Sequence, residues 1–486
     1  MSQCNTSGLN VYVPSDSMPW TEDRVKHLYR RAGHGATYAM VQEGLAMTPE
    51  ELVDKLVDEA IAMPVVEDPG WGYADRSTLG ANFSGFRSNF SVMQHWLYDN
   101  MRNDNLFGRM QMFWKNHFCT EYSASGGIIP YNFQQIVMWQ TYGLGNFREF
   151  VRALGTDPQM LYYLNGFQNK AGEPNENYAR ELYELFTLGV DNGYTETDIE
   201  QTAIALTGYN SYETLWGKIL FNENGTFDES DKTIFGQTGN WGHDDVIDIL
   251  FEQKGRLVAE NICRKFYRNF ISAQVDETII DGLATTFVDN DYEIAPVLRQ
   301  LFKSEHFFND DSIGSLIKSP MELIIQFQKE LDIVSGNDES NSLNYRAWVI
   351  GFYLDMELFE PPNVAGWPGD EFWINSATIS ARFQRMSHAV VYRRDEGLDV
   401  YASFAQTLFP DVTTSADEVA RGIVDFVLTS PLEFENEYEE AISTFKSGVP
   451  AVYFSDGTWD LNYVGLDVQV HNLMQYIIEL PEYQLK

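Results

Sequence analysis

Residues 174–189, Pro-Asn-Glu-Asn-Tyr-Ala-Arg-Glu-Leu-Tyr-Glu-Leu-Phe-Thr-Leu-Gly, decide the fold class of this chain. Pro174 and Asn175 are typical of a helix start, and Gly189 is the residue type that commonly follows a helix end. At about 100° per residue, the stretch has one apolar side and one polar side. The apolar side holds Tyr178, Leu182, Leu185 and Phe186, and the polar side holds Asn177, Arg180, Glu181 and Glu184. The pattern therefore predicts one amphipathic helix whose apolar side packs on a core.

The polar side of this helix has two interpretations. Glu176 and Glu184 stand four residues before and after Arg180, the spacing at which helical side chains form ion pairs. In the first interpretation, the side is a solvated surface held by ion pairs. In the second, it is a polar cluster facing a cleft, where Arg180 orients Glu181 and Glu184. The sequence leaves both open.

Outside this stretch, helical patterns dominate the chain. We expect a mainly α fold, a large multi-helix, single-core and bundle-like domain, because 486 residues can bury a large core. One β-hairpin is expected near 217–228, where Asn222-Glu-Asn-Gly supplies turn residues. The expected organisation is an extended N-terminal arm over 1–20, a main helical domain over 21–390 and an acidic helical extension over 391–486 packed on it.

The composition excludes several classes of function. The formal net charge is −38, which repels phosphate backbones and makes nucleic acid an unfavourable partner. No apolar run approaches the roughly 20 residues of a membrane span. Cys4, Cys119 and Cys263 lack the spacing of a metal site, and no motif identifies a cofactor. The N-terminus shows no secretory signal, so the default expectation is a cytoplasmic protein.

A helix expected at about 105–118 carries His117 on its apolar arc and Asn116 off it. A histidine on a buried helix face is usually a core group satisfied by one hydrogen bond. The alternative is a ligand or proton carrier. Sequence alone keeps both roles for His117.

The stretch Pro361-Pro-Asn-Val-Ala-Gly-Trp-Pro-Gly cannot form regular structure because of its prolines and glycines. It is either a rigid connector or a loop that presents Asn363 and Trp367. Asn375 follows in Ile374-Asn-Ser-Ala-Thr. We expect His117, the polar side of 174–189 and the Asn363–Trp367 loop to meet at one concavity.

Several separated segments together resemble one bacterial family, the domain-of-unknown-function family numbered eighteen hundred. They are Arg30-Arg-Ala-Gly-His-Gly-Ala, Phe113-Trp-Lys-Asn-His-Phe, residues 153–164, residues 174–189, Ala205-Leu-Thr-Gly-Tyr, Phe235-Gly-Gln-Thr-Gly-Asn, Lys318-Ser-Pro, residues 361–369 and Ile374-Asn-Ser-Ala-Thr. Relatives usually have Phe where this chain has His34. The resemblance implies an accessory role beside a sulfatase- or phosphatase-like partner protein, and export, which the N-terminus does not indicate.

Two functions follow as expectations. The first is a binding or accessory protein with a polar Arg/Glu/Asn cleft. Its ligand-binding residues would be Arg180, Asn177, Glu176, Asn116, Asn363, Trp367 and Asn375. The alternative is a metal-assisted or acid/base hydrolase that uses Glu181, Glu184 and His117. No nucleophile elbow, HExxH or dinucleotide-binding motif is present to favour a particular reaction.

Overall fold

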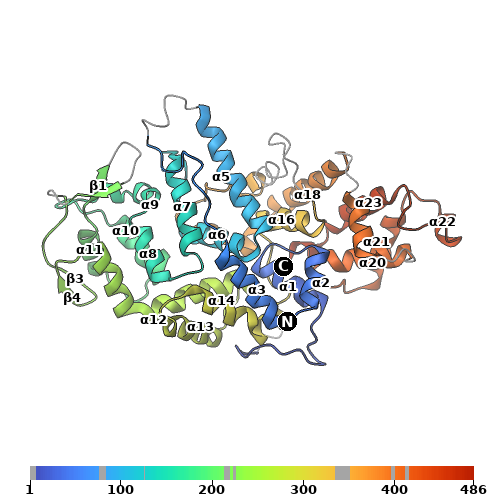
Figure 1. Cartoon of the computed structure of the whole chain (residues 1–486), viewed down its shortest axis with the longest axis horizontal. Helices are drawn as coiled ribbons and strands as arrows, with labels where there is room; N and C mark the ends of the chain where they lie inside the picture. The colour runs from blue at the N-terminus through green and yellow to red at the C-terminus, as the bar shows by residue number, and fades with distance from the viewer. Residues whose placement is uncertain are drawn as a thin grey trace.

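The computed structural model describes residues 7–75, 84–124, 126–212, 219–222, 226–333, 351–395, 400–410 and 415–486. The fold is mainly α, as the sequence predicts, and elongated in the view of Figure 1. The short strands lie at one end, the helices of the last eighty residues lie at the other, and the C-terminus returns to the middle (Figure 1). Within these ranges, no helix combines the length and apolar composition that a membrane crossing needs.

The elements follow one another in three groups. The first comprises α1 (Glu22–Ala32), α2 (Tyr38–Leu45), α3 (Pro49–Ala62), α5 (Ser84–Asn103), α6 (Asn105–His117), α7 (Ile129–Tyr142), α8 (Phe147–Gly155), α9 (Pro158–Tyr163) and the 3-10 turn η1 (Gly166–Gln168). The second comprises α10 (Asn177–Glu181), the π-helix η2 (Leu182–Thr187), α11 (Glu196–Ala205), β1 (Tyr209–Tyr212), β2 (Ile219–Phe221), β3 (Lys232–Ile234), β4 (Gln237–Gly239), α12 (His243–Phe270), α13 (Glu277–Asp289), α14 (Ile294–Lys303), α15 (Glu305–Phe308) and η3 (Asp310–Ser312). The third comprises α16 (Pro320–Glu330), η4 (Asp370–Trp373), α18 (Thr378–Asp395), α19 (Val400–Leu408), α20 (Ala416–Val427), α21 (Glu435–Lys446), α22 (Ala451–Ser455), α23 (Leu466–Ile477) and η5 (Pro481–Gln484).

The β structure consists of two small antiparallel pairs. The expected strand at Ile219–Phe221 is present as β2, but it pairs with the preceding β1 instead of with Thr226 and Phe227. Part of the expected turn, residues 223–225, lies outside the described residues. The second pair, β3–β4, closes through Phe235 and Gly236, whose φ values of 46° and 81° suit a tight two-residue hairpin turn.

One part of the core joins α6 to the long helix α12 and to α8 through aromatic side chains. Trp114 of α6 is fully buried, and its ring lies 5.8 Å from that of Phe266 of α12 and 5.1 Å from that of Phe150 of α8. These rings meet edge to face, a favourable arrangement for aromatic pairs. The same connected apolar core includes residues from Tyr12 to Tyr483, so it reaches all three expected segments of the chain.

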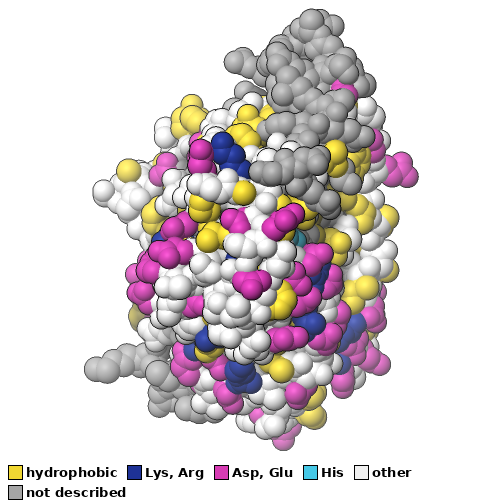
Figure 2. All heavy atoms as spheres, turned by 90° about the vertical axis from the view of Figure 1, so that its left-hand side faces the viewer, with side chains coloured by type: hydrophobic (Ala, Val, Ile, Leu, Met, Phe, Trp, Pro, Cys, Tyr) yellow, Lys and Arg dark blue, Asp and Glu magenta, His cyan; other side chains and the backbone are white. Residues whose placement is uncertain are grey.

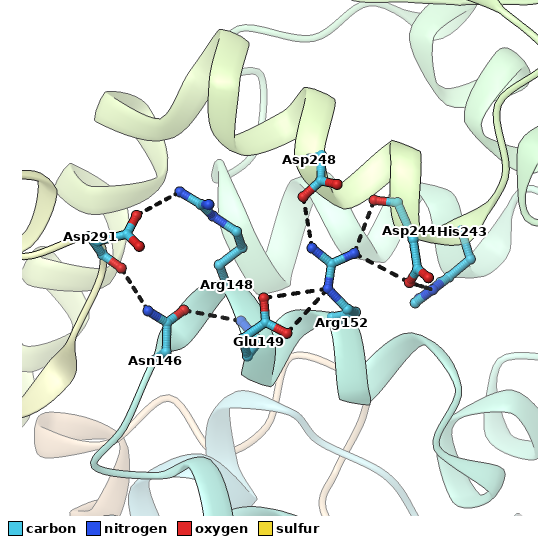
Figure 3. Close-up of polar contacts among 8 residues, drawn as sticks. All are labelled: Asn146, Arg148, Glu149, Arg152, His243, Asp244, Asp248 and Asp291. Carbon is cyan, nitrogen blue, oxygen red and sulfur yellow. Dashed lines mark hydrogen bonds and ion pairs between the residues drawn. The ribbon is translucent and has the colours of Figure 1, made fainter.

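Surface ion pairs fix α8 against α12 (Figure 3). Arg152 of α8 contacts Asp248 at 2.7 Å and Asp244 at 3.2 Å, both in the first turns of α12. One turn earlier, Arg148 reaches Asp291 in the turn between α13 and α14, at 2.9 Å. Acidic residues at a helix start also interact favourably with the helix dipole. These contacts hold α12 in a fixed position across the molecule, and its far end forms one wall of the site described below.

Buried cations of α1 connect it to the last helices of the chain. Arg30 donates to the carbonyl oxygens of Phe426, Val427 and Leu428 at the end of α20, at 2.8–3.0 Å. It also forms an ion pair with Glu330 of α16 at 2.7 Å, and the two side chains are 1% and 2% exposed. Helix-end carbonyls need such external donors. One guanidinium therefore holds α1, α16 and α20 together.

We predict that Arg30→Ala lowers the free energy of unfolding by about 3–5 kcal/mol, because it leaves the Glu330 carboxylate buried without its partner. The matched control is Arg264→Ala, which removes a partly exposed ion pair with Glu277 and costs less than about 1 kcal/mol. Denaturant unfolding followed by circular dichroism measures both values. Equal losses in the two variants would contradict the prediction.

Candidate functional site

A cavity of about 550 Å³ opens where α6, the end of α12, the start of α16 and the segment 365–373 meet. Asn116, His117 and Trp367 of the expected site residues line it. Further aromatic lining comes from Phe113 and Trp373. A cavity of this size suits a small organic ligand.

Asn116 holds the Trp367 loop in place. Its side-chain oxygen accepts a hydrogen bond from the Trp367 N–H at 2.8 Å, and its amide donates to the Trp367 carbonyl at 3.1 Å. Gly366 precedes Trp367 with a φ of +78°, and a Cβ there would lie 2.4 Å from the Asn116 side-chain oxygen. The rigid loop expected from its prolines is therefore fastened to α6 by one amide, and Trp367 is only 3% exposed.

Asn363 and Asn375 serve the local backbone. The Asn363 side chain accepts a hydrogen bond from the Ala365 N–H at 2.8 Å, which forms a turn within the loop. The Asn375 side chain accepts from the N–H groups of Ala377 and Thr378, so it caps the start of α18. Both residues are exposed, and neither lines the cavity.

His117 lies between the cavity and the π-helix η2. Its Nε2 is 3.1 Å from the Phe186 carbonyl oxygen, which can only accept, so Nε2 carries the proton. Burial and the Lys265 charge hold the pKa of His117 well below its usual value, although the Phe186 bond opposes the shift. The neutral ring leaves Nδ1 as an acceptor, and it has no partner within the described chain.

The helix expected over 174–189 is divided in the structure. Five residues of α-helix, α10, are followed by η2, a π-helix, which the 3.6-residue periodicity does not predict. The carbonyl oxygens at its end are bonded by neighbours: Lys265 donates to Leu185 at 3.0 Å, and Asn261 donates to Thr187 at 2.8 Å. His117 of α6 donates a hydrogen bond to the Phe186 carbonyl. The three consecutive carbonyls of residues 185–187 are therefore all bonded to side chains of α6 and α12.

The polar side of this helix faces away from the cavity. Arg180 is 33% exposed and pairs with Glu176, Glu184 and Glu196 at 3.4, 3.2 and 2.7 Å. Burial and then Glu184 raise the pKa of Glu181. None of Glu176, Asn177, Arg180, Glu181 and Glu184 lines the cavity. The structure thus brings His117 and Trp367 together at one concavity and places the Arg180 cluster at the surface, where exposed ion pairs contribute little stability.

The cavity has a charged wall that the sequence analysis missed. Its basic residues are Arg109, Lys265, Arg268 and Lys486, and its acidic residues are Glu322 and Asp370. The buried Glu322 forms ion pairs with both Arg109 and Lys486, and its second oxygen accepts from the Ser319 N–H at 2.7 Å. Burial alone would raise the pKa of Glu322, but these two cations hold it well below its usual range.

The spacing of some residues of this charged wall in the sequence indicates that they lie together. Lys265, Arg268 and Asn269 recur three and four residues apart on α12, which places them on one helix face. Arg109 stands seven residues before Asn116, so the two lie on the same side of α6. Lys486 carries no local signal, because only the tertiary fold brings it to Glu322.

No group of three or more His, Cys, Asp or Glu residues within the described ranges is arranged to hold a metal ion. Glu181 and Glu184 do not line the cavity with His117, and the Nε2 of His117 is bonded to a carbonyl. The described lining of the cavity offers cations, two carboxylates, amides and aromatic rings.

We predict that Gly366→Ala destabilises the protein more than Gly369→Ala. Both glycines have a positive φ, 78° and 83°, so each substitution carries a backbone cost of roughly 1–2 kcal/mol. Only at Gly366 does the new methyl group collide with Asn116, whereas nothing lies within 4 Å of it at Gly369. The measurement is the free energy of unfolding of both variants; identical values would show that the Asn116 contact does not constrain the loop.

Comparisons with known proteins give one family. No curated protein and no solved structure matches the chain. The model of the family described as "Protein of unknown function (DUF1800)" matches residues 27–485, from α1 to the last residues beside the cavity. This range includes every lining residue of the cavity except Lys486 and confirms the resemblance seen in the sequence motifs, so the chain belongs to the DUF1800 family.

Proposed function

We propose that this protein is a binding protein that holds a small organic molecule in the cavity between α6, α12 and the segment 365–373. The observation that carries the proposal is a set of unpaired polar atoms. Arg109 Nε, His117 Nδ1 and Asn269 Nδ2 are buried atoms of cavity residues, and none has a hydrogen-bond partner within the described chain. Buried polar atoms are nearly always paired in proteins, but unpaired ones also occur away from the cavity, in Gln159 and Arg382 for example. The three atoms favour a ligand because their residues line one cavity of small-molecule size.

The shape and rigidity of the walls support this proposal. Trp367 is fixed through its main chain by Asn116, and Trp373 is 5% exposed. His117 and Lys265 are both bonded to carbonyls of η2. A largely preformed pocket of aromatic rings with a few oriented polar groups is the usual form of a small-molecule site.

The geometry favours binding over the hydrolase alternative. The hydrolase alternative needs an acid and a base at one site, and the sequence assigns these roles to Glu181, Glu184 and His117. Of the two carboxylates in the cavity wall, Glu322 is ion-paired with a lowered pKa, and Asp370 accepts a hydrogen bond from the Ile317 N–H at 2.9 Å. Glu181 and Glu184 lie elsewhere. An accessory role beside a sulfatase-like protein is supported by the family resemblance alone.

We predict that Ala273→Trp blocks the cavity. Ala273 is exposed at the cavity rim, so a large ring there obstructs the mouth without disturbing the core. Thermal unfolding of the purified full chain against a panel of small neutral, anionic and cationic compounds should reveal ligands that stabilise the parent. At a concentration 100 times its Kd, a ligand stabilises by about 2.7 kcal/mol.

The control is Ala62→Trp, an equally large change at an exposed residue that ends α3 and lies outside the cavity lining. It should respond to each ligand as the parent does, whereas Ala273→Trp should lose the response. Native mass spectrometry of the protein as purified adds a second readout, because a retained ligand should be present in the parent and reduced in Ala273→Trp. A response unchanged by Ala273→Trp would place the ligand elsewhere and refute the proposed site.

A further inference from the structure

The cavity wall differs in charge from the rest of the protein. The chain has a net charge of −38, and acidic side chains are numerous on the face that carries α11 and β3–β4 (Figure 2). The cavity lining instead has four basic residues and two acidic ones. Both cations nearest to Glu322, Arg109 and Lys486, are ion-paired with it. Glu322 offsets only one of these two charges, and Lys265 and Arg268 add two further positive charges to the lining.

Lys265 and Arg268 have no carboxylate at ion-pair distance within the described residues, although the Arg264 hydrogen bond and, to a smaller extent, the Arg268 charge lower the pKa of Glu277. Within the described chain, neither forms an ion pair, and the one hydrogen bond of the Lys265 ammonium goes to the neutral Leu185 carbonyl. Arg264, on the same helix, instead binds Glu277 at 2.7 Å. Most other basic side chains of α12 and its neighbours are paired in this way, as an acidic protein permits. Lys254 on the same helix and the buried Lys115 and Lys318 also form no ion pair within the described chain. Lys265 and Arg268 differ from them because both line the cavity.

The two cations also act on each other. They stand three residues apart on α12 and so lie on the same side of the helix. Burial and the Arg268 charge lower the pKa of Lys265 to about 8. An anion bound between them would remove this mutual repulsion and restore the charged lysine. The Asn269 amide, one residue further, adds an unpaired N–H donor to the same wall.

The cavity lining also includes large apolar side chains. Trp367 and Trp373 lie there with Met356 and Leu316, and each of the four is less than 6% exposed. Aromatic rings of this kind bind flat or apolar groups. The cavity lining therefore combines cations with aromatic rings.

We propose that the ligand is a small organic oxyanion, whose carboxylate, sulfate or phosphate group binds Lys265, Arg268 and Asn269 and whose apolar body packs on Trp367 and Trp373. This inference rests on the proposed function and names the chemical class of the ligand. Arginine and lysine both bind such oxygens strongly, and the contact strengthens where water is excluded.

The test is a matched set of probes with one phenyl body and different head groups, bound to the full chain and measured by calorimetry. The anions are 3-phenylpropionate, phenyl sulfate and phenyl phosphate, the neutral probe is 3-phenylpropanamide, and the cation is 3-phenylpropylamine. We expect at least one anion to bind at least tenfold more tightly than the amide and the amine. Its affinity should fall as the salt concentration rises.

Two variants locate the oxyanion. Arg268→Met should weaken binding of the preferred anion at least tenfold while the protein stays folded, because Arg268 is exposed and makes no hydrogen bond within the described chain. Lys265→Met should weaken it similarly. The matched control is Arg264→Met. It also removes one positive charge from α12, but Arg264, the residue before Lys265, lies outside the cavity lining, so binding should be unchanged.

The outcomes separate this inference from the proposed function. If the amide or the amine binds as tightly as the anions and Ala273→Trp abolishes that binding, the cavity is a ligand site but the oxyanion inference is wrong. It is also wrong if no anion of the set binds at millimolar concentration, or if Arg268→Met and Lys265→Met bind the anion as the parent does. If anions bind equally to Ala273→Trp, both proposals fail.

Discussion

The buried carboxylate of Glu322 is the constraint on which the cavity depends. A charge removed from water must be compensated nearby, and here Arg109 from α6 and Lys486 from the end of the chain share that task. The second carboxylate oxygen of Glu322 accepts a hydrogen bond from the Ser319 N–H, as part of the capping box that starts α16. Three segments far apart in the sequence are thereby fixed around one point. The remaining wall, α12, is positioned separately by its contacts with α8 and η2.

The sequence predicts the parts of this protein that depend on local rules. Thr195 and Ser319 are of residue types that favour a helix start, and each caps a helix in the structure. The mainly α class follows from helical periodicity. Local rules also describe the 361–369 loop as rigid. They do not say what holds it, because the answer is Asn116, some 250 residues away in the chain. The family itself was recognisable because its motifs are long and occur in order.

The candidate site was harder to predict, for a physical reason. Arg180 and its carboxylates form a dense polar pattern in the sequence, yet density of charge is typical of a solvated surface as much as of a cleft. The cavity uses fewer charges, and Lys265 and Arg268 look ordinary on a long helix until their lack of ion pairs is seen. Such a lack is a property of the fold, so sequence alone cannot show it. At physiological ionic strength the surface charge is screened within about 8 Å, and the local cations determine what the cavity attracts.

The π-helix η2 has a consequence for how this segment tolerates change. Its neighbours bind its main chain, at the carbonyls of Leu185, Phe186 and Thr187. These hydrogen bonds therefore depend on the number of residues that precede the carbonyls more than on the identity of the η2 side chains. Removing a single residue from Leu182–Thr187 would turn the following carbonyls by about 100° around the helix axis. His117, Lys265 and Asn261 would then lose their acceptors at once. A substitution in η2 leaves these main-chain hydrogen bonds in place. A change in its length removes the hydrogen bonds that join it to α6 and α12.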